Sequence, residues 1–194
     1  MDELDSLSLR EGVLSGGERA QKAFLSLWEY YYKRLLFFAG SYRGLPYSEY
    51  EDAVADTLIA VFLSLARYDP SKPLSPWVYR IAANRFSDAA RRAKRISPVL
   101  IGESDGNFPS LEPSVPDTQV SEAVAKDLLE KCKKTIDTLP ETDRRIAYLK
   151  FYENMNAKEI GTILKLPPGT VRWKIYTIRN SIAVSLGEDY GRHR

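Results

Sequence analysis

Cysteine and histidine are nearly absent from this sequence, which limits the chemistry that it can support. Its 194 residues include one cysteine, Cys132, and one histidine, His193. A lone cysteine cannot form a disulfide within the chain, and one residue of each type cannot complete a Cys/His zinc site. Catalysis by a histidine base is also disfavoured. A zinc site of this kind and catalysis by histidine are therefore not expected in this chain.

Long apolar runs are also missing. No segment approaches the roughly 20 consecutive apolar residues of a membrane-spanning helix. The N-terminal sequence, MDELDSLSLR, is acidic and therefore unlike a signal peptide. We therefore expect a cytoplasmic protein without membrane insertion.

Basic residues are absent from one stretch and concentrated in two others. Residues 96–122 contain 5 acidic side chains and no lysine or arginine, although the net charge of the whole chain is +2. Residues 68–95 contain 7 basic and 2 acidic side chains, and residues 123–194 contain 14 basic and 9 acidic ones. Two basic blocks on either side of an acidic one predict two anion-binding surfaces.

Apolar residues recur at helical spacing on both sides of the acidic stretch, which predicts an all-α fold with two small helical domains. We expect a mobile N-terminal segment at 1–17 and a first helical bundle at 18–95. Residues 96–120, with four prolines and no basic residue, are typical of a flexible acidic linker. A second helical domain is expected at 121–187 and a C-terminal tail at 188–194.

One face of the helix expected at about 47–67 combines carboxylates with apolar side chains. The opposite face supplies the core, with Val54, Leu58 and Val61 at helical spacing. Exposed apolar groups beside carboxylates indicate an interface for a basic, partly apolar partner. A divalent-metal site and a merely solvated acidic face are the alternatives. The residues of this face are Glu49, Asp52, Asp56, Ile59 and Leu63.

The densest positive charge lies in the helix expected at 74–95. Ser75 is the predicted N-cap and Pro76 the predicted first helical residue, after a loop at 68–73 that two prolines stiffen. Arg85 is expected to point towards the apolar stripe of this helix, and either to extend its charge into solvent or to pair with a carboxylate. Cations and an amide on the opposite face suit phosphates and base edges, whereas a solvated charged face is the alternative. That face carries Arg80, Asn84, Ser87, Arg91 and Lys94.

The second basic block contains the pattern of a helix-turn-helix. Asn156 and Glu159 form a capping-box signature for a short helix, and Pro168-Gly169-Thr170 opens a longer last helix after a turn. A short helix, a tight turn and a longer helix are typical of a helix-turn-helix, although such pairs also merely pack bundles. On the last helix Trp173, Tyr176 and Asn180 are expected to face outward, with Arg172 and Thr177 on the flanks.

Short motifs in both halves resemble one protein family. In the first half they are Tyr50-Glu51-Asp52, Asp56-Thr57, Trp77-Val78-Tyr79-Arg80-Ile81-Ala82, Asn84, Asp88 and Arg91-Arg92. In the second half they are Leu139-Pro140-Glu141, Glu159-Ile160 and Pro168-Gly169-Thr170-Val171-Arg172. In this order, with a linker between them, the motifs resemble the extracytoplasmic-function (ECF) sigma factors of bacterial RNA polymerase. The resemblance covers roughly residues 23–95 and 136–186.

The resemblance implies a transcription initiation factor that binds core RNA polymerase. Such a factor is not an enzyme, and it is expected to have no catalytic residue, no metal and no cofactor. The first domain, sigma2, would bind the clamp helices of the largest polymerase subunit through Glu49, Asp52, Asp56, Ile59 and Leu63 of the acidic helix. It would also open the promoter minus-ten element and hold its melted bases. The residues implied in this second contact are Tyr68, Lys72, Trp77, Arg80, Asn84, Ser87, Arg91, Arg92 and Lys94.

The second domain, sigma4, would read the duplex minus-thirty-five element and touch the flap of the second-largest subunit. The sequence departs from the family where Trp173 replaces a common small serine and Thr177 a common arginine, so the promoter sequence does not transfer. The resemblance leaves open an anti-sigma factor as an inhibitory partner. The residues implied in minus-thirty-five binding are Gly169, Thr170, Arg172, Trp173, Tyr176, Thr177, Arg179 and Asn180.

Two other functions fit parts of the sequence. One is a free-standing helix-turn-helix regulator whose N-terminal bundle only dimerises, which would bind duplex DNA tightly without polymerase. The other is a metal-dependent hydrolase that uses Glu49, Asp52 and Asp56, whose stability would respond to divalent ions.

Overall fold

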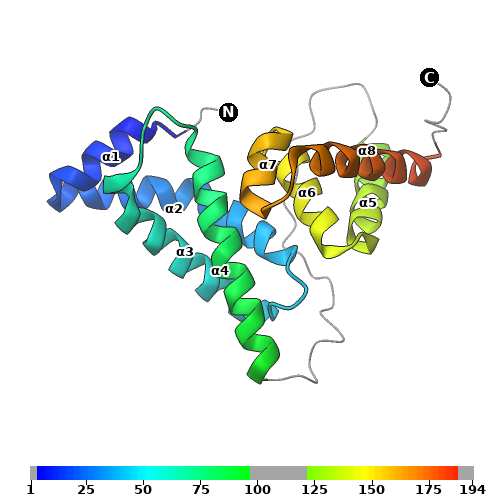
Figure 1. Cartoon of the computed structure of the whole chain (residues 1–194), viewed down its shortest axis with the longest axis horizontal. Helices are drawn as coiled ribbons and strands as arrows, with labels where there is room; N and C mark the ends of the chain where they lie inside the picture. Colours follow the sequence, from blue (N-terminus) through cyan, green and yellow to red (C-terminus); the bar gives the residue numbers. More distant parts are fainter. Residues whose placement is uncertain (1–3, 97–121, 188–194) are drawn as a thin grey trace. The chain divides into compact units, whose positions relative to one another are not determined.

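The computed structural model describes residues 4–96 and 122–187, with the backbone alone over 122–129. Every regular element in these residues is helical, which confirms the all-α expectation (Figure 1). The expected linker beyond Ile96 and the expected tail at 188–194 lie outside the described residues. None of the helices in the described ranges is long and apolar enough to cross a membrane.

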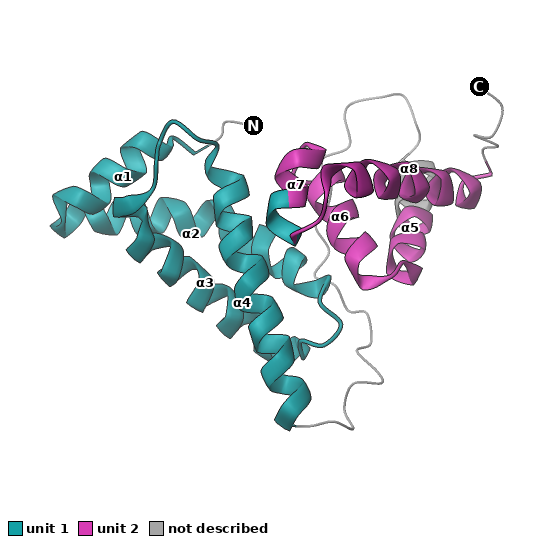
Figure 2. Ribbon diagram, in the orientation of Figure 1, with its two compact units in different colours: residues 1–108, 162–164 teal, residues 109–161, 165–194 magenta. Residues whose placement is uncertain are grey.

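The chain divides into two compact units, which are described separately below. One comprises residues 1–108 with 162–164, and the other residues 109–161 with 165–194 (Figure 2).

The core of the first unit is rich in aromatic rings. Phe38 packs edge-to-face against Tyr42 and Tyr79, with ring centroids 5.5 and 5.2 Å apart, and Tyr42 packs in the same way against Phe86 at 5.6 Å. All four side chains are buried. The elements of this unit are α1 (Ser6–Ser15), α2 (Gly17–Gly40), η1 (Tyr47–Glu49), α3 (Tyr50–Ser64), η2 (Leu65–Arg67) and α4 (Leu74–Ile96).

The N-terminal segment forms a packed helix, not the mobile segment that we expected at 1–17. Asp5 caps α1, because its carboxylate accepts hydrogen bonds from the backbone N–H groups of Leu7 and Ser8 at 3.1 and 3.4 Å. Leu9 is buried, at 4% exposure. The Asp5 cap and the buried Leu9 therefore contribute to holding this helix in place, and Gly16 alone separates it from α2.

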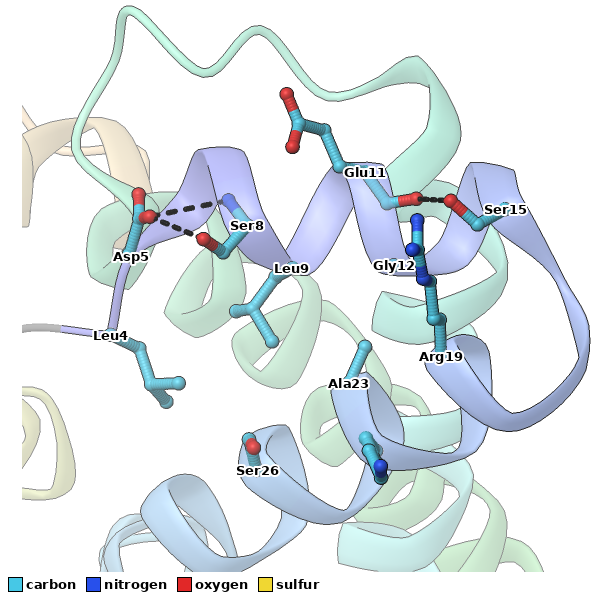
Figure 3. A pocket seen from close by; sticks show the side chains of 11 residues that line it. Leu4, Asp5, Ser8, Leu9, Glu11, Gly12, Ser15, Arg19, Ala23 and Ser26 are labelled. Carbon is cyan, nitrogen blue, oxygen red and sulfur yellow. Dashed lines mark hydrogen bonds between the residues drawn. The ribbon is translucent and has the colours of Figure 1, made fainter.

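A close crossing joins α1 to α2. A Cβ atom on Gly12 would lie 2.9 Å from the Cβ of Ala23, so the two backbones approach each other where both side chains are small. Beside this crossing the helices leave a groove of about 380 Å³, lined by Asp5, Arg19 and Lys22 among others (Figure 3). Arg10 Nε of α1 also donates a 3.4 Å hydrogen bond to the carbonyl oxygen of Ala66 in η2.

The second unit contains the predicted short and long helices with the turn between them. The capping box is confirmed: the Asn156 side chain accepts from the backbone of Glu159 at 3.0 Å, and the Glu159 carboxylate accepts from the Asn156 N–H at 2.8 Å. Val171 and Ile178 of the last helix are buried in the core with Ile146. Its helices are α5 (Glu122–Thr138), α6 (Glu141–Phe151) and α8 (Pro168–Ser185), together with α7 (Ala157–Leu164), whose residues 162–164 are grouped with the first unit.

Candidate functional site

The outer face of α3 is acidic at one end and apolar at the other. Asp52 and Asp56 are exposed, and Ile59 and Leu63 follow on the same face with exposed fractions of 47% and 71%. We call these four residues the α3 face. Within the described residues neither carboxylate forms an ion pair. Glu49, which we expected on this face, is half-buried in η1 just before the helix.

The α3 face projects because the rest of α3 is held in the core. Val54, Leu58 and Val61 are fully buried, as their spacing predicted. Among the described residues no three cysteine, histidine, aspartate or glutamate side chains gather closely enough to hold a metal ion. The carboxylates of α3 are therefore arranged along a surface, which suits a partner better than it suits a metal ion.

The loop at 68–73 between η2 and α4 is fixed by its own side chains. The Asp69 carboxylate accepts hydrogen bonds from the Ser71 hydroxyl at 2.7 Å and the Ser71 N–H at 3.1 Å. These bonds stabilise the charged carboxylate, chiefly the bond from the hydroxyl, and lower the pKa of Asp69 below its ordinary value. Lys72, expected at the minus-ten element, is exposed and pairs with Asp69 at 3.4 Å.

Tyr68 is buried, which corrects its expected place among surface residues that contact DNA. Only 5% of it is exposed, and its hydroxyl donates to the carbonyl oxygen of Lys72. Its ring packs against the half-buried Trp77, with centroids 4.7 Å apart. Sequence alone could not show this, because a loop tyrosine has no periodicity that distinguishes buried from exposed. Tyr68 therefore shapes the loop from within.

The outer face of α4 is basic along most of its length. Arg91 pairs with Asp88 at 2.8 Å, with both side chains more than 60% exposed, so this surface pair contributes little to stability. Ser87 is half-buried. Within the described residues the remaining cations of this face form no ion pair. Its exposed residues are Arg80, Asn84, Arg91, Arg92 and Lys94.

Two expectations about α4 need correction. Arg85 is exposed and adds to the positive charge, because the buried face extends over Tyr79 and Ala83 and leaves Arg85 at its edge. Ser75 is not an N-cap, because α4 begins at the buried Leu74, two residues before the predicted first helical residue, Pro76. The Ser75 hydroxyl is hydrogen-bonded to the Tyr31 hydroxyl at 2.8 Å. The start of α4 is thus anchored in the core of its unit.

The outer face of α8 presents two large aromatic side chains to solvent. Trp173 is 62% exposed and Tyr176 64% exposed, and Lys174 beside them pairs with Asp143 of α6. This ion pair, which we did not anticipate, joins α8 to α6 in the second unit. The other residues predicted at the minus-thirty-five element divide into the exposed Gly169, Arg172, Thr177 and Arg179 and the half-buried Thr170 and Asn180.

Comparison with known families matches both units. The family model described as sigma-70 region 2 matches residues 21–96, and that of sigma-70, region 4 matches residues 135–175, together more than half of the chain. The first match includes α3, the loop and α4, and the second includes the helix-turn-helix up to the N-terminal half of α8. Helix α1 lies outside both matches.

Curated relatives carry sigma-factor names. The chain is 30% identical over 132 residues to the ECF RNA polymerase sigma factor SigE of Mycolicibacterium smegmatis, covering 68% of this chain but only about half (49%) of that protein. It is 29% identical over 142 residues to the ECF RNA polymerase sigma factor SigW of Bacillus subtilis, covering 71% and 75% of the two chains. The RNA polymerase sigma factor CnrH of Cupriavidus metallidurans is 28% identical over 153 residues, with coverages of 75% and 78%.

Solved structures show the same fold. A structure of CnrH in complex with the cytosolic domain of CnrY aligns with a TM-score of 0.59 at 23% identity, over 95% of this chain and 98% of that one. The sigma factor RpoE of Bartonella quintana, in complex with the anti-sigma factor NepR, aligns with a TM-score of 0.59 at 21% identity, over 87% and 97%. With both sigma-70 regions present in order, the chain belongs to the ECF group of the RNA polymerase sigma factors.

Proposed function

We propose that this chain binds core RNA polymerase and directs it to a subset of promoters, opening the minus-ten element and reading the minus-thirty-five element. The observation that carries the proposal is the combination of three exposed surfaces in the two sigma-70 regions: the α3 face, the basic face of α4 and the outer face of α8. Each has the chemistry of a different partner.

The α3 face is proposed to contact the clamp helices of the largest polymerase subunit. Asp52 and Asp56 attract a basic surface and steer its approach. Ile59 and Leu63, exposed on the same face, offer the apolar area that a stable contact needs. A partner surface with arginines beside apolar side chains would complement both the acidic and the apolar part of the α3 face.

The minus-ten element is proposed to bind the loop at 68–73 and the basic face of α4. Arg80, Asn84 and Arg92 are exposed and free to contact phosphates and unpaired bases. Trp77, half-buried against Tyr68, offers part of a ring on which an unstacked base could lie. The hydrogen bonds of Asp69 keep the loop in one conformation, which lowers the entropic cost of binding melted DNA.

The minus-thirty-five duplex is proposed to bind α8, and the second unit to touch the flap of the second-largest subunit. Arg172 lies in the N-terminal half of α8, where recognition helices contact base edges, and arginine suits guanine.

An anti-sigma factor is a further proposed partner, since RpoE of Bartonella quintana forms a complex with one. We assign the chain no catalytic reaction and place its action in the cytoplasm, with the polymerase.

The test reverses the sign of the charge on the α3 face. We expect Asp52→Arg combined with Asp56→Arg to abolish co-purification with core polymerase and promoter-specific run-off transcription. The unfolding temperature should stay unchanged, because both side chains face solvent. The matched control is Glu11→Arg combined with Glu29→Arg, two exposed carboxylates of the same unit outside α3. This control should retain both activities, and core binding by the α3 variant would refute the assignment.

The same reagents separate a sigma factor from a free-standing regulator. A sigma factor should show weak binding to duplex DNA alone and selective transcription only with core polymerase. Tight sequence-specific binding by the isolated chain, unaffected by the α3 substitutions, would favour the regulator instead.

A further inference from the structure

Trp173 is the largest side chain on the outer face of α8, and it points away from the core of its unit. It is 62% exposed, whereas Val171 and Ile175 on either side of it are buried. Trp173 is the sixth residue of α8, which begins at Pro168. Recognition helices contact base edges with their N-terminal residues. If α8 enters a major groove as proposed above, the indole ring lies on the part of the helix that reaches base edges.

The surface around the Trp173 indole is less polar than its sequence suggests. The Thr177 hydroxyl donates a 3.1 Å hydrogen bond to the Trp173 carbonyl oxygen, so its polar group is engaged with the helix. The Lys174 ammonium group pairs with Asp143 of α6 and lies over one face of the Trp173 ring, 6.0 Å from its centroid. The indole of Trp173, the ring of Tyr176 and the methyl group of Thr177 are thus the apolar groups that this turn of α8 offers to a partner.

The major groove offers one apolar group to such a surface. The edges of guanine, cytosine and adenine present hydrogen-bond donors and acceptors there, whereas thymine also presents its C5-methyl group. An indole face laid over a polar edge would remove water from donors and acceptors without replacing their hydrogen bonds. Laid over a thymine methyl group, the same ring buries apolar area on both sides.

We propose that Trp173 recognises the methyl group of a thymine in the minus-thirty-five duplex. The inference rests on the proposed reading of that duplex by α8, and it adds the base and the atom that are read. Arg172 and Arg179, exposed on the flank of the same helix, suit guanine or phosphate. We therefore expect α8 to contact guanine and at least one thymine in the minus-thirty-five element.

The experiment uses core polymerase reconstituted with the full chain. The wild-type holoenzyme first selects its minus-thirty-five sequence from duplexes randomised in that region. Each thymine of the selected sequence is then replaced singly by deoxyuridine, which removes only the methyl group. We expect one replacement to weaken wild-type binding about fourfold, the effect of about 0.8 kcal/mol for a buried methyl-sized group at 1.4 kcal/mol per tenfold change.

Variants identify the residue that senses the methyl group. With Trp173→Ser the same replacement should change affinity less than 1.5-fold, roughly the scatter of such measurements, and Trp173→Phe should keep part of the sensitivity. Val184→Ser, which removes another exposed apolar side chain of α8, should behave as wild type. All variants should unfold at the wild-type temperature, because both positions are exposed.

Three results would overturn the inference. The first is a selected element without thymine. The second is a methyl effect that persists undiminished in Trp173→Ser. The third is an equal loss of affinity by Trp173→Ser for every duplex, which would indicate a contact with protein or phosphate. Failure of the wild-type holoenzyme to select any duplex sequence is a different result, because it would contradict the proposed function and this inference together.

Discussion

A Cβ atom added to Gly161 would lie 2.6 Å from the carbonyl oxygen of Leu166, closer than Cβ contacts in proteins come. That oxygen belongs to the backbone of the turn between α7 and α8, and Leu166 in turn donates its N–H to the Gly161 carbonyl oxygen at 2.9 Å. An alanine at 161 must therefore displace the turn. We expect Gly161→Ala to lower the free energy of unfolding by about 1–3 kcal/mol, measured by urea denaturation.

Gly169→Ala is the matched control for that substitution. No atom lies within 4 Å of a Cβ placed on Gly169, which is in the first turn of α8. Since alanine also favours the helix over glycine, the stability should stay the same or rise slightly. Equal losses in the two variants would show that the close approach at Leu166 is not the cause.

Residues whose role depends on nearby sequence were predicted better than residues whose role depends on the fold. The capping box of Asn156 and Glu159 is local, so three-residue spacing was enough to find it. The exposure of Arg85 depends on how far the buried face of α4 extends, which is set by packing across α2 and α4. The burial of Tyr68 depends on the conformation of a loop, which the spacing of apolar residues in the sequence does not predict.

Among the elements, α1 shows how little burial holds a short helix in place. Leu9 is its one buried residue, in a helix that packs against α2 and η2. We expect Leu9→Ala to cost about 2–3 kcal/mol in urea denaturation, at the low end for buried leucines. The loss in free energy of unfolding should not exceed this range, because α1 can detach from the unit without breaking the aromatic core of α2 and α4.

Leu14→Ala is the control on the same helix. Leu14 is 58% exposed, so its removal should change the free energy of unfolding by less than about 0.5 kcal/mol. If Leu9→Ala were equally harmless, α1 would not be docked in solution, and the original expectation of a mobile segment at 1–17 would be the better description.

The longer helices were predictable because their periodicity extends over several turns. In α3 and α4 the apolar stripes repeat often enough to fix which face is buried, and Val54, Leu58, Val78 and Phe86 are buried accordingly. In α1 only Leu9 of the ten residues is buried, so no apolar stripe extends over several turns. The acidic α3 face was predictable for the same reason as the core of α3, since it occupies the opposite side of that helix.

At the scale of the whole molecule, the net charge of +2 conceals strong local charge. The basic face of α4 is either a DNA-binding surface or a merely solvated one, and salt dependence distinguishes these cases. Each phosphate neutralised on single-stranded DNA contributes about 0.7, and on duplex DNA about 0.9, to the slope of log K against log salt concentration. We expect Arg92→Ala combined with Lys94→Ala to make this slope shallower by about 1.5 for holoenzyme binding to promoter DNA.

The control for this measurement removes the same charge from another element. Lys22 and Lys33 are exposed on α2, and Lys22 pairs with Glu18 at 2.9 Å. Lys22→Ala combined with Lys33→Ala lowers the net charge by the same two units, so a general effect of charge would appear equally in both variants. A change in slope confined to the α4 variant would locate the DNA on that helix. An unchanged slope would mean that Arg92 and Lys94 are solvated in the complex, and that the minus-ten contact is limited to the loop and the N-terminal part of α4.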